Sequence, residues 1–253
     1  MWRYGAVDPQ QVRLMLNARG RFDLYPLVIH ASYLINLGSS DPALHAKSVE
    51  AFRTEIERGI EIGADYLVVH PGNYKGCTSV EEGIMTVVRG ITDATRGLKS
   101  RKFEILIENT VGAGCSIGGK LQEVAAIRQL AEKQTEVRIN YCIDTCHCFC
   151  SGYDVSTEAG LRDTVKIIET LLGVDNVKVI HTNDSKTTFN SHVDRHENIG
   201  EGHIGLEGFR RILNHPKLRS KAFILETPVD NEGDDRRNLD TLKSLVKRTA
   251  RRR

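Results

Sequence analysis

The chain has 253 residues, of which 40% are hydrophobic, and this is enough to build the core of one α/β domain. Its 35 lysine and arginine residues nearly balance its 33 aspartate and glutamate residues, so the formal net charge is only +2. This balance excludes the global positive field of a purely electrostatic nucleic-acid binder, and any such surface must be local. We predict a single domain over residues 1–253 with a basic tail over residues 247–253.

The first residues, Met1-Trp2-Arg3-Tyr4, do not resemble the basic and apolar start of a signal peptide. No window of the sequence approaches the roughly 18 consecutive apolar residues of a membrane span. Four of the six cysteines crowd between Cys142 and Cys150, unlike a spaced disulfide framework. We therefore expect a soluble cytoplasmic protein with reduced thiols and no membrane partner.

Short apolar runs recur along the chain at intervals near 40 residues, and helical patterns separate them. Continuous apolar runs are typical of strands that are buried on both faces of a parallel sheet. The predicted strands are residues 26–30, 66–70, 104–108, 140–144, 178–181 and 222–226. The predicted helices are residues 42–63, 80–98, 121–133, 157–172 and 206–213.

This alternation of strands and helices predicts six consecutive βα units. Right-handed crossovers curl such a series toward closure, which favours a (β/α)-barrel over an open, doubly wound sheet. The absence of a GxGxxG turn after the first strand also argues against a dinucleotide-binding fold. A closed barrel of this kind has eight strands, so we expect an incomplete barrel.

Every predicted strand ends in a histidine, an aspartate or a glutamate. The carboxyl ends of parallel barrel strands open onto one face, where active sites lie, so these side chains should converge. The six residues at strand ends are His30, His70, Glu108, Asp144, His181 and Glu226. Three further candidates, His147, Asp194 and His196, follow strand ends at a short distance or lie in the long loop after His181.

These nine side chains form a nitrogen and oxygen donor set that suits zinc or manganese better than magnesium or calcium. Nine ligands are too many for one tetrahedral ion, but they supply three sites if one carboxylate is shared. A metal cluster of this type suits phosphodiester hydrolysis. Sugar isomerisation on the same kind of barrel is an alternative that these residues alone leave open.

The cysteines Cys146, Cys148 and Cys150 alternate with other residues near this predicted site. If the segment is extended, successive side chains point to opposite sides, and His147 is the better-matched candidate ligand. We therefore predict that the cysteines are small buried residues outside the metal site.

Several motifs together resemble the endonuclease IV family of apurinic/apyrimidinic endonucleases, in order from about Trp2 to Leu245. The most specific are the DTCH run that ends at His147 and the DRHENIGEGHIG run that begins at Asp194. Supporting segments are HASYLINL from His30, HPGN from His70, IENT from Ile107, HTNDSK from His181 and LET from Leu225.

The resemblance implies a xylose isomerase-like TIM barrel. It also implies three bound zinc ions, with Mn²⁺ as an alternative metal. The expected substrate is double-stranded DNA that contains abasic sites. The first zinc would be held by His30, His70 and Glu108. The second would be held by Glu108 as a bridge with Asp144, His181 and Glu226, and the third by His147, Asp194 and His196. Glu108 would also position the nucleophile, and Glu226 could accept a proton. The cut would fall 5′ to an abasic site, leaving a 3′ hydroxyl and a 5′ deoxyribose phosphate.

The resemblance also assigns DNA contacts. Tyr33 matches a tyrosine that enters DNA near the lesion, although an aromatic residue packed at the barrel rim is an alternative. Lys186 and Arg195 in the loop of residues 183–205 are candidates for phosphate contacts, with solvated surface charge as the alternative. The glycine-rich loop of residues 112–119 could approach a phosphate or could be a simple turn.

The sequence departs from the family at its start, where the segment that carries the first two strands and two DNA-inserting side chains has no counterpart. An uncovered sheet edge promotes pairing, so we expect a late start codon or a homodimer that covers this edge. Besides the repair endonuclease, two alternative functions are considered. They are a sugar isomerase or epimerase on the same fold, and a truncated zinc- and DNA-binding protein with little activity.

Overall fold

The structure is a computed structural model that describes residues 5–100 and 102–247. The chain divides into two compact units, which are described separately. The first unit contains the described residues of Met1–Glu108, Gly114–Gly118 and Gln122–Tyr141. The second unit contains those of Asn109–Ala113, Gly119–Leu121 and Cys142–Arg253. The single domain predicted over residues 1–253 stays a prediction.

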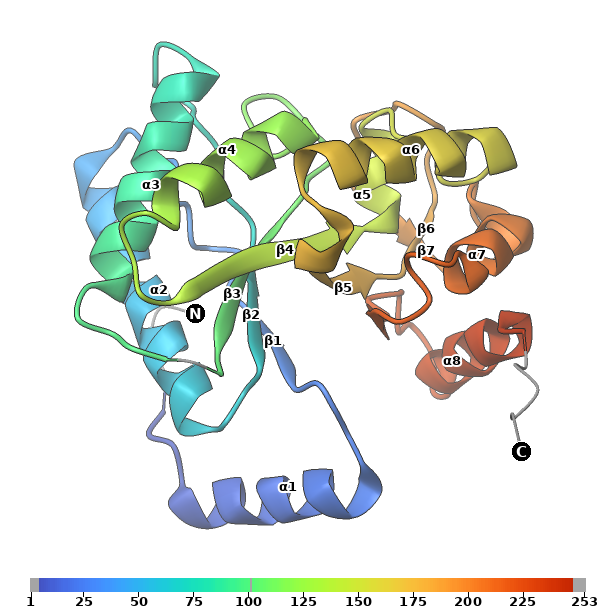
Figure 1. Cartoon of the computed structure of the whole chain (residues 1–253), viewed down its shortest axis with the longest axis horizontal. Helices are drawn as coiled ribbons and strands as arrows, with labels where there is room; N and C mark the ends of the chain where they lie inside the picture. Colours follow the sequence, from blue (N-terminus) through green and yellow to red (C-terminus); the bar gives the residue numbers. More distant parts are fainter. Residues whose placement is uncertain (1–4, 101, 248–253) are drawn as a thin grey trace. The chain divides into compact units, whose positions relative to one another are not determined.

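The first unit alternates helices and strands. Its elements are α1 (Pro9–Phe22), β1 (Val28–His30), α2 (Pro42–Glu61), β2 (Tyr66–Val69), α3 (Val80–Thr95), β3 (Glu104–Glu108) and most of α4 (Leu121–Ala131). Strands β1, β2 and β3 pair in parallel, with Val28 opposite Tyr66 and Tyr66 opposite Glu104. Helices α2 and α3 lie side by side next to these strands (Figure 1). The buried side chains of β2 and β3 form the core of this unit.

The second unit continues the alternation and adds a short antiparallel ribbon. Strand β4 (Arg138–Asp144) begins in the first unit and ends in the second. The elements that follow are α5 (Thr145–Cys150), α6 (Glu158–Leu171), a 3₁₀ turn at Val174–Asn176, β5 (Val177–His181), β6 (Asp184–Ser185), β7 (His196–Glu197), α7 (Gly205–Asn214), β8 (Ala222–Ile224) and α8 (Asp234–Leu245). Strands β5 and β8 pair in parallel, and Figure 1 shows α7 next to α8.

Six strands form the main sheet of the described chain, in the hydrogen-bonded order β1-β2-β3-β4-β5-β8. This confirms the six predicted strands. β3 has the predicted bounds, whereas β2 ends one residue before His70 and β8 ends two residues before Glu226. The start of the resemblance at about Trp2 lies outside the described residues, and so does most of the predicted basic tail. Within the described chain, no helix is long and apolar enough to cross a membrane.

The helices begin where the sequence supplies caps. Asp41 and Ser79 precede α2 and α3, and their side chains accept backbone N–H groups of the first turn. Pro42 then occupies the first turn of α2, where the missing N–H costs no intrahelical hydrogen bond. Thr157 caps α6 in the same way. These local signals explain the starts of α2, α3 and α6, and all five predicted helices are found within a few residues of their expected bounds.

The sequence analysis did not predict helix α1, although Asp8 caps it and Pro9 lies in its first turn. Among its side chains only that of Arg19 is buried. The Arg19 guanidinium lies 2.6 Å from Asp65 Oδ2 and also donates to the carbonyl oxygen of Gly63 at 2.8 Å. Asp65 Oδ2 accepts the backbone N–H of Leu27 as well. One partly buried ion pair therefore links α1 to the segments that enter β1 and β2.

Replacing Arg19 with alanine should loosen this attachment. We expect Arg19→Ala to lower the free energy of unfolding by about 2 kcal/mol, because Asp65 and the Gly63 carbonyl lose a charged donor while Asp65 keeps its bond to Leu27. Urea unfolding followed by circular dichroism measures this change. Arg13→Ala, at an exposed position of the same helix, is the control and should leave the midpoint unchanged. Equal midpoints for the two variants would contradict this role of Arg19.

Candidate metal centre

The first unit brings together three of the predicted ligands. Glu108 at the end of β3 is fully buried, and its Oε2 lies 3.1 Å from His30 Nε2 and 3.5 Å from His70 Nε2. About a third of each histidine side chain is exposed. Their ligand atoms all lie within 4.8 Å of one another, as the atoms around a shared ion must. A carboxylate without solvent contact needs such partners, since an isolated buried charge is costly.

The second unit assembles His147, Asp194 and His196 in the same way. His147 Nε2 is 3.2 Å from Asp194 Oδ2, and His196 Nε2 is 3.3 Å from Asp194 Oδ1, so one carboxylate faces both imidazoles. The remaining ring nitrogens contact backbone carbonyls. His147 Nδ1 lies 2.9 Å from the oxygen of Asn109, and His196 Nδ1 lies 3.0 Å from that of Glu226. Carbonyl contacts of this kind fix the ring orientation and leave Nε2 available for a metal.

The other three predicted ligands also lie in the second unit. His181 ends β5, and its Nδ1 is 3.1 Å from Glu226 Oε2. Asp144 ends β4 and is fully buried, with Oδ2 at 3.9 Å from His196 Nε2. The side chain of Asn183 joins this group, because its Nδ2 donates to Asp144 Oδ2 at 2.5 Å and contacts Glu226 Oε2 at 3.4 Å. Asp144, His181 and Glu226 thus form a connected polar cluster.

Charge is concentrated around His196. Burial would lower the pKa of this histidine, but contact with Asp194 and the charge of Asp144 outweigh it and raise the pKa to about 9. Burial acts in the opposite direction on Asp194, yet contact with His147 and His196 lowers the pKa of its carboxyl. The carboxylate is therefore ionised at neutral pH and ready to accept a cation.

One buried atom indicates what the cluster lacks. His196 Nε2 is buried and has no hydrogen-bond partner with proper geometry in the part of the chain that the structure describes. Buried polar atoms normally have a partner, so this nitrogen calls for one, and a metal ion would supply it. An imidazole nitrogen surrounded by carboxylates and a second imidazole is the donor set that zinc prefers. The residues present therefore fit a metal.

The backbone at the cysteines is helical rather than extended. Residues Thr145–Cys150 form helix α5, because Asp144 Oδ1 accepts the backbone N–H of His147 at 2.8 Å and caps it. All three cysteines of this helix are buried. The Cys146 thiol lies within 4.8 Å of ligand atoms of Asp144 and His196. Its hydrogen bond with Cys150 and its burial raise the pKa of the Cys146 thiol.

The long loop after His181 contains an unexpected ribbon. Strands β6 and β7 pair antiparallel, with Asp184 opposite Glu197 and Ser185 opposite His196. The ribbon places Lys186 and Arg195 side by side, since the Lys186 N–H donates to the Arg195 oxygen at 2.9 Å. Both side chains are exposed, and Lys186 Nζ lies 3.9 Å from Glu197 Oε2. They are thus accessible, but nothing in the structure assigns them a ligand.

The two other predicted DNA-contacting features have different surroundings. The Tyr33 side chain is 87% exposed, which contradicts the alternative of an aromatic residue packed at the rim. In the glycine-rich loop, Gly112 and Gly119 pack closely, and a Cβ at Gly119 would lie 2.5 Å from the Gly112 Cα. These glycines are therefore required for backbone packing, and a phosphate is not needed to explain them.

Two further residues of the cluster, Asn183 and Asp184, were not singled out in the sequence. Both are fully buried directly after β5. A signal was present, because two adjacent buried polar residues must have partners in the fold. The partners themselves lie up to 43 positions away in the chain and could not be identified from spacing.

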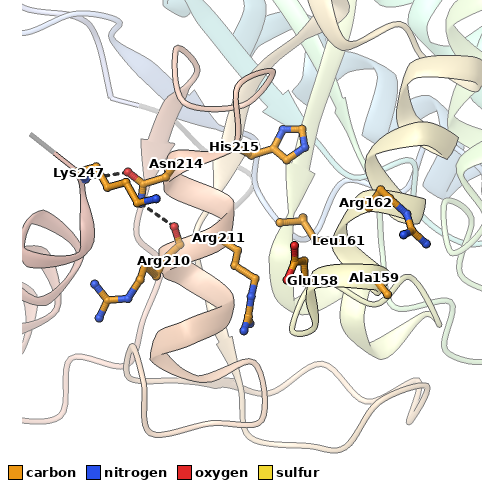
Figure 2. Close-up of a pocket in the computed structure, with 9 residues that line it drawn as sticks. All are labelled: Glu158, Ala159, Leu161, Arg162, Arg210, Arg211, Asn214, His215 and Lys247. Atoms are coloured by element: carbon orange, nitrogen blue, oxygen red, sulfur yellow. Dashed lines mark hydrogen bonds between the residues drawn. The ribbon is translucent and has the colours of Figure 1, made fainter. Parts of the chain in front are cut away.

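A cavity of about 650 Å³ lies elsewhere in the second unit, between the first turn of α6 and the C-terminal half of α7 (Figure 2). Figure 2 shows Arg211 and Glu158 among its lining side chains. None of the predicted ligands lines it. Its arginines already have partners, since Arg162 pairs with Asp163, Arg210 pairs with Glu207, and Arg211 donates to the Ser156 oxygen. The cavity is therefore not part of the candidate metal centre.

Comparisons with known proteins agree with these features. The family described as xylose isomerase-like TIM barrel matches residues 3–246. A probable endonuclease 4 of Solibacter usitatus is 57% identical over 246 residues, which are 97% of this chain and 84% of the relative.

Two solved structures can be compared. Endonuclease IV from Thermus thermophilus has 34% identity and a TM-score of 0.83, over 97% of this chain and 84% of that one. A D-tagatose 3-epimerase-like protein, at 20% identity and a TM-score of 0.70, covers 94% of this chain and 83% of its own and shares the fold alone. By the family match and the identity to these endonucleases, the chain belongs to the endonuclease IV family, on the xylose isomerase-like TIM-barrel fold.

Proposed function

We propose that the protein is a metal-dependent apurinic/apyrimidinic endonuclease that cleaves double-stranded DNA on the 5′ side of an abasic site. The observation that carries the proposal is that all nine predicted ligand residues lie in clusters of histidines and carboxylates within their own units. The endonuclease 4 relatives support the substrate class. The products would be a 3′ hydroxyl and a 5′ deoxyribose phosphate.

Three zinc ions would bind to the three ligand sets. His30, His70 and Glu108 hold one, Asp144, His181 and Glu226 hold another, and His147, Asp194 and His196 hold the third. The additional sharing of Glu108 with the second ion stays a prediction. Bound zinc supplies Lewis acidity to the phosphodiester and lowers the pKa of water toward about 7. Manganese would serve the same donor set.

The protein side chains would perform the remaining steps. Glu108, buried between two imidazoles, orients the attacking water and cannot turn toward solvent. Glu226 is a third exposed, so it can accept a proton and pass it to solvent. Tyr33 enters the duplex beside the lesion, and Lys186 and Arg195 neutralise phosphates. A cytoplasmic location and a homodimer stay predictions.

Two alternatives make different predictions. A sugar isomerase or epimerase would turn over free ketoses, and the likeness to an epimerase-like protein extends only to the fold. A zinc- and DNA-binding protein with little activity would bind about three zincs and leave abasic DNA intact. Elemental analysis paired with a nicking assay on a duplex with one abasic site separates all three functions.

The first test concerns Glu108. We expect Glu108→Gln to reduce the rate of nicking at least about a hundredfold, since losing even an indirect metal contact costs 10–100-fold. Single-turnover nicking measures the rate. Glu104→Gln is the matched control, because Glu104 is also buried on β3 but contacts Asn140 instead of the histidines. Normal nicking by the Glu108 variant would refute the proposed mechanism.

The second test concerns Tyr33. If this tyrosine stacks on DNA bases, Tyr33→Ala should weaken binding of an abasic duplex about 10–100-fold, because one base stack contributes roughly 1–3 kcal/mol. The melting temperature should not change, since the side chain is 87% exposed. Fluorescence anisotropy with a labelled duplex measures affinity. Phe22→Ala removes another exposed aromatic side chain, and an equal loss in this control would argue against a specific role.

The third test concerns Lys186 and Arg195. Neutralising both as Lys186→Gln with Arg195→Gln should reduce the slope of log affinity against log salt by about 2, because two phosphate contacts are lost. Affinity for intact and abasic duplexes should fall by a similar factor. Titrations at several salt concentrations provide the slope. The double variant Lys75→Gln with Lys120→Gln removes two other lysines as a charge-matched control, and an unchanged slope for the Lys186 and Arg195 pair would reject the phosphate contacts.

A further inference from the structure

Asn183 and Asp184 are adjacent, fully buried residues at the start of β6 that touch the ligand-bearing segments of the second unit. Neither belongs to the nine predicted ligands. The Asn183 side chain contacts two proposed ligands, Asp144 and Glu226. The Asp184 side chain instead contacts the ribbon of β6 and β7 and the loop that follows it. This division of contacts indicates two separate roles.

Asn183 connects two carboxylates with one neutral amide. Its Nδ2 donates to Asp144 Oδ2 at 2.5 Å and contacts Glu226 Oε2 at 3.4 Å, while its Oδ1 accepts the Glu226 backbone N–H at 2.8 Å. Its own backbone is held by Thr145, whose hydroxyl accepts the Asn183 N–H at 2.9 Å and donates to the Asn183 oxygen at 2.7 Å. An aspartate here would place a third carboxylate against the other two.

Asp184 instead holds a loop. Its carboxylate accepts backbone N–H groups from five residues: Ser185 at 2.8 Å, Gly200 at 2.9 Å, Gly202 at 3.1 Å, Ile204 at 2.9 Å and Gly205 at 3.3 Å. These donors enclose the carboxylate closely, since a Cβ at Gly202 would lie 2.5 Å from Asp184 Oδ1. Both oxygens accept N–H groups, so an asparagine would direct its NH₂ group at donors.

The loop matters because of what it connects. It runs from β7 (His196–Glu197) to the start of α7 at Gly205, and β7 pairs with β6, which begins at Asp184. The His203 N–H also donates to the Ser185 oxygen at 2.8 Å. Asp184 therefore holds the segment that follows His196 between Gly200 and Gly205, next to the ribbon that carries His196.

We propose that Asn183 and Asp184 are two independent positioning residues for the metal centre. Asn183 orients Asp144 and Glu226 in the set completed by His181, and Asp184 orients the ribbon of Asp194 and His196 in the set completed by His147. The inference rests on the proposed three-metal function. Loss of either residue should weaken the binding of one ion about 10–100-fold and leave the other two ions bound, as for other residues that orient metal ligands.

The experiment measures bound zinc at fixed free zinc by elemental analysis, with competing chelators to obtain affinities. Asn183→Ala and Asp184→Asn are compared with the parent protein and in a His147→Ala background, which removes the third ligand set. In that background, Asp184→Asn should cause no further loss, whereas Asn183→Ala should remove one more ion. Raising free zinc about a hundredfold should restore the lost ion in either single variant, because the higher concentration compensates for an affinity that has fallen by up to about a hundredfold.

Two control variants report purely structural effects. Asn140→Ala removes another buried asparagine that donates to a carboxylate, Glu104 Oε2 at 2.7 Å. Asp234→Asn alters another buried carboxylate that accepts backbone N–H groups, those of Asp230 and Asn231. Both should lower stability without changing zinc content. If the first variants fail to fold, Asn183→Gln and Asp184→Glu retain the functional group with one extra methylene and should shift the affinities in the same direction.

The outcomes separate this inference from the proposed function. A parent protein that binds no zinc would overturn the proposed function and the inference with it. A parent that binds three zincs, with all three retained at unchanged affinity in both single variants, would overturn the inference alone. Additional zinc loss on adding Asp184→Asn to His147→Ala would reject the separate roles, and zinc loss in either control would reduce both residues to general structural support.

Discussion

The burial of carboxylates at the ends of parallel strands is the constraint on which this structure depends. Glu108 and Asp144 end β3 and β4 without solvent contact, and Asp184 is equally buried three residues after β5. A buried carboxylate destabilises the fold unless donors compensate it. The chain satisfies Glu108 with two imidazoles, Asp144 with an amide and a backbone N–H, and Asp184 with five backbone N–H groups. These three sets of partners differ in whether they leave the carboxylate available to a metal ion.

These differences separate ligands from supports. Imidazole neighbours can give up a proton and share a cation with the carboxylate, so Glu108 remains available as a ligand. Backbone N–H groups cannot do so, and Asp184 is therefore committed to holding its loop. Asn183 lies between these cases, because its amide orients two carboxylates without competing with a metal for charge. The adjacent residues Asn183 and Asp184 thus have unlike partners despite their similar shapes.

Much of this arrangement could be predicted from the sequence, since strand-end residues such as His30 and Glu108 are marked by apolar runs that precede them. The elements that were missed lack such patterns. Helix α1 buries only Arg19, helix α5 is buried throughout, and the polar helix α8 buries two polar residues with only two leucines. Strands β6 and β7 have two residues each, which is too short for any alternation to be visible.

The site shows the same limit. Residue type and position were sufficient to select His147 and His196, whose role depends on their own chemistry. They were not sufficient to select Asp184, whose role depends on N–H donors 16–21 positions later in the chain. Family resemblance supplied the substrate, because no property of the ligand residues alone distinguishes a phosphodiester from a sugar. The contact between Asp184 and this loop could therefore be recognised only from the folded structure.

The division of the chain into two units has a consequence for how bound metal would stabilise the protein. His30, His70 and Glu108 belong to one unit, whereas His147, Asp194 and His196 belong to the other. Ions that bind only the folded state add stability by mass action, about 2.7 kcal/mol at a hundred times the dissociation constant. With separate ligand sets, each unit would gain this stability only from the ions that its own residues would hold.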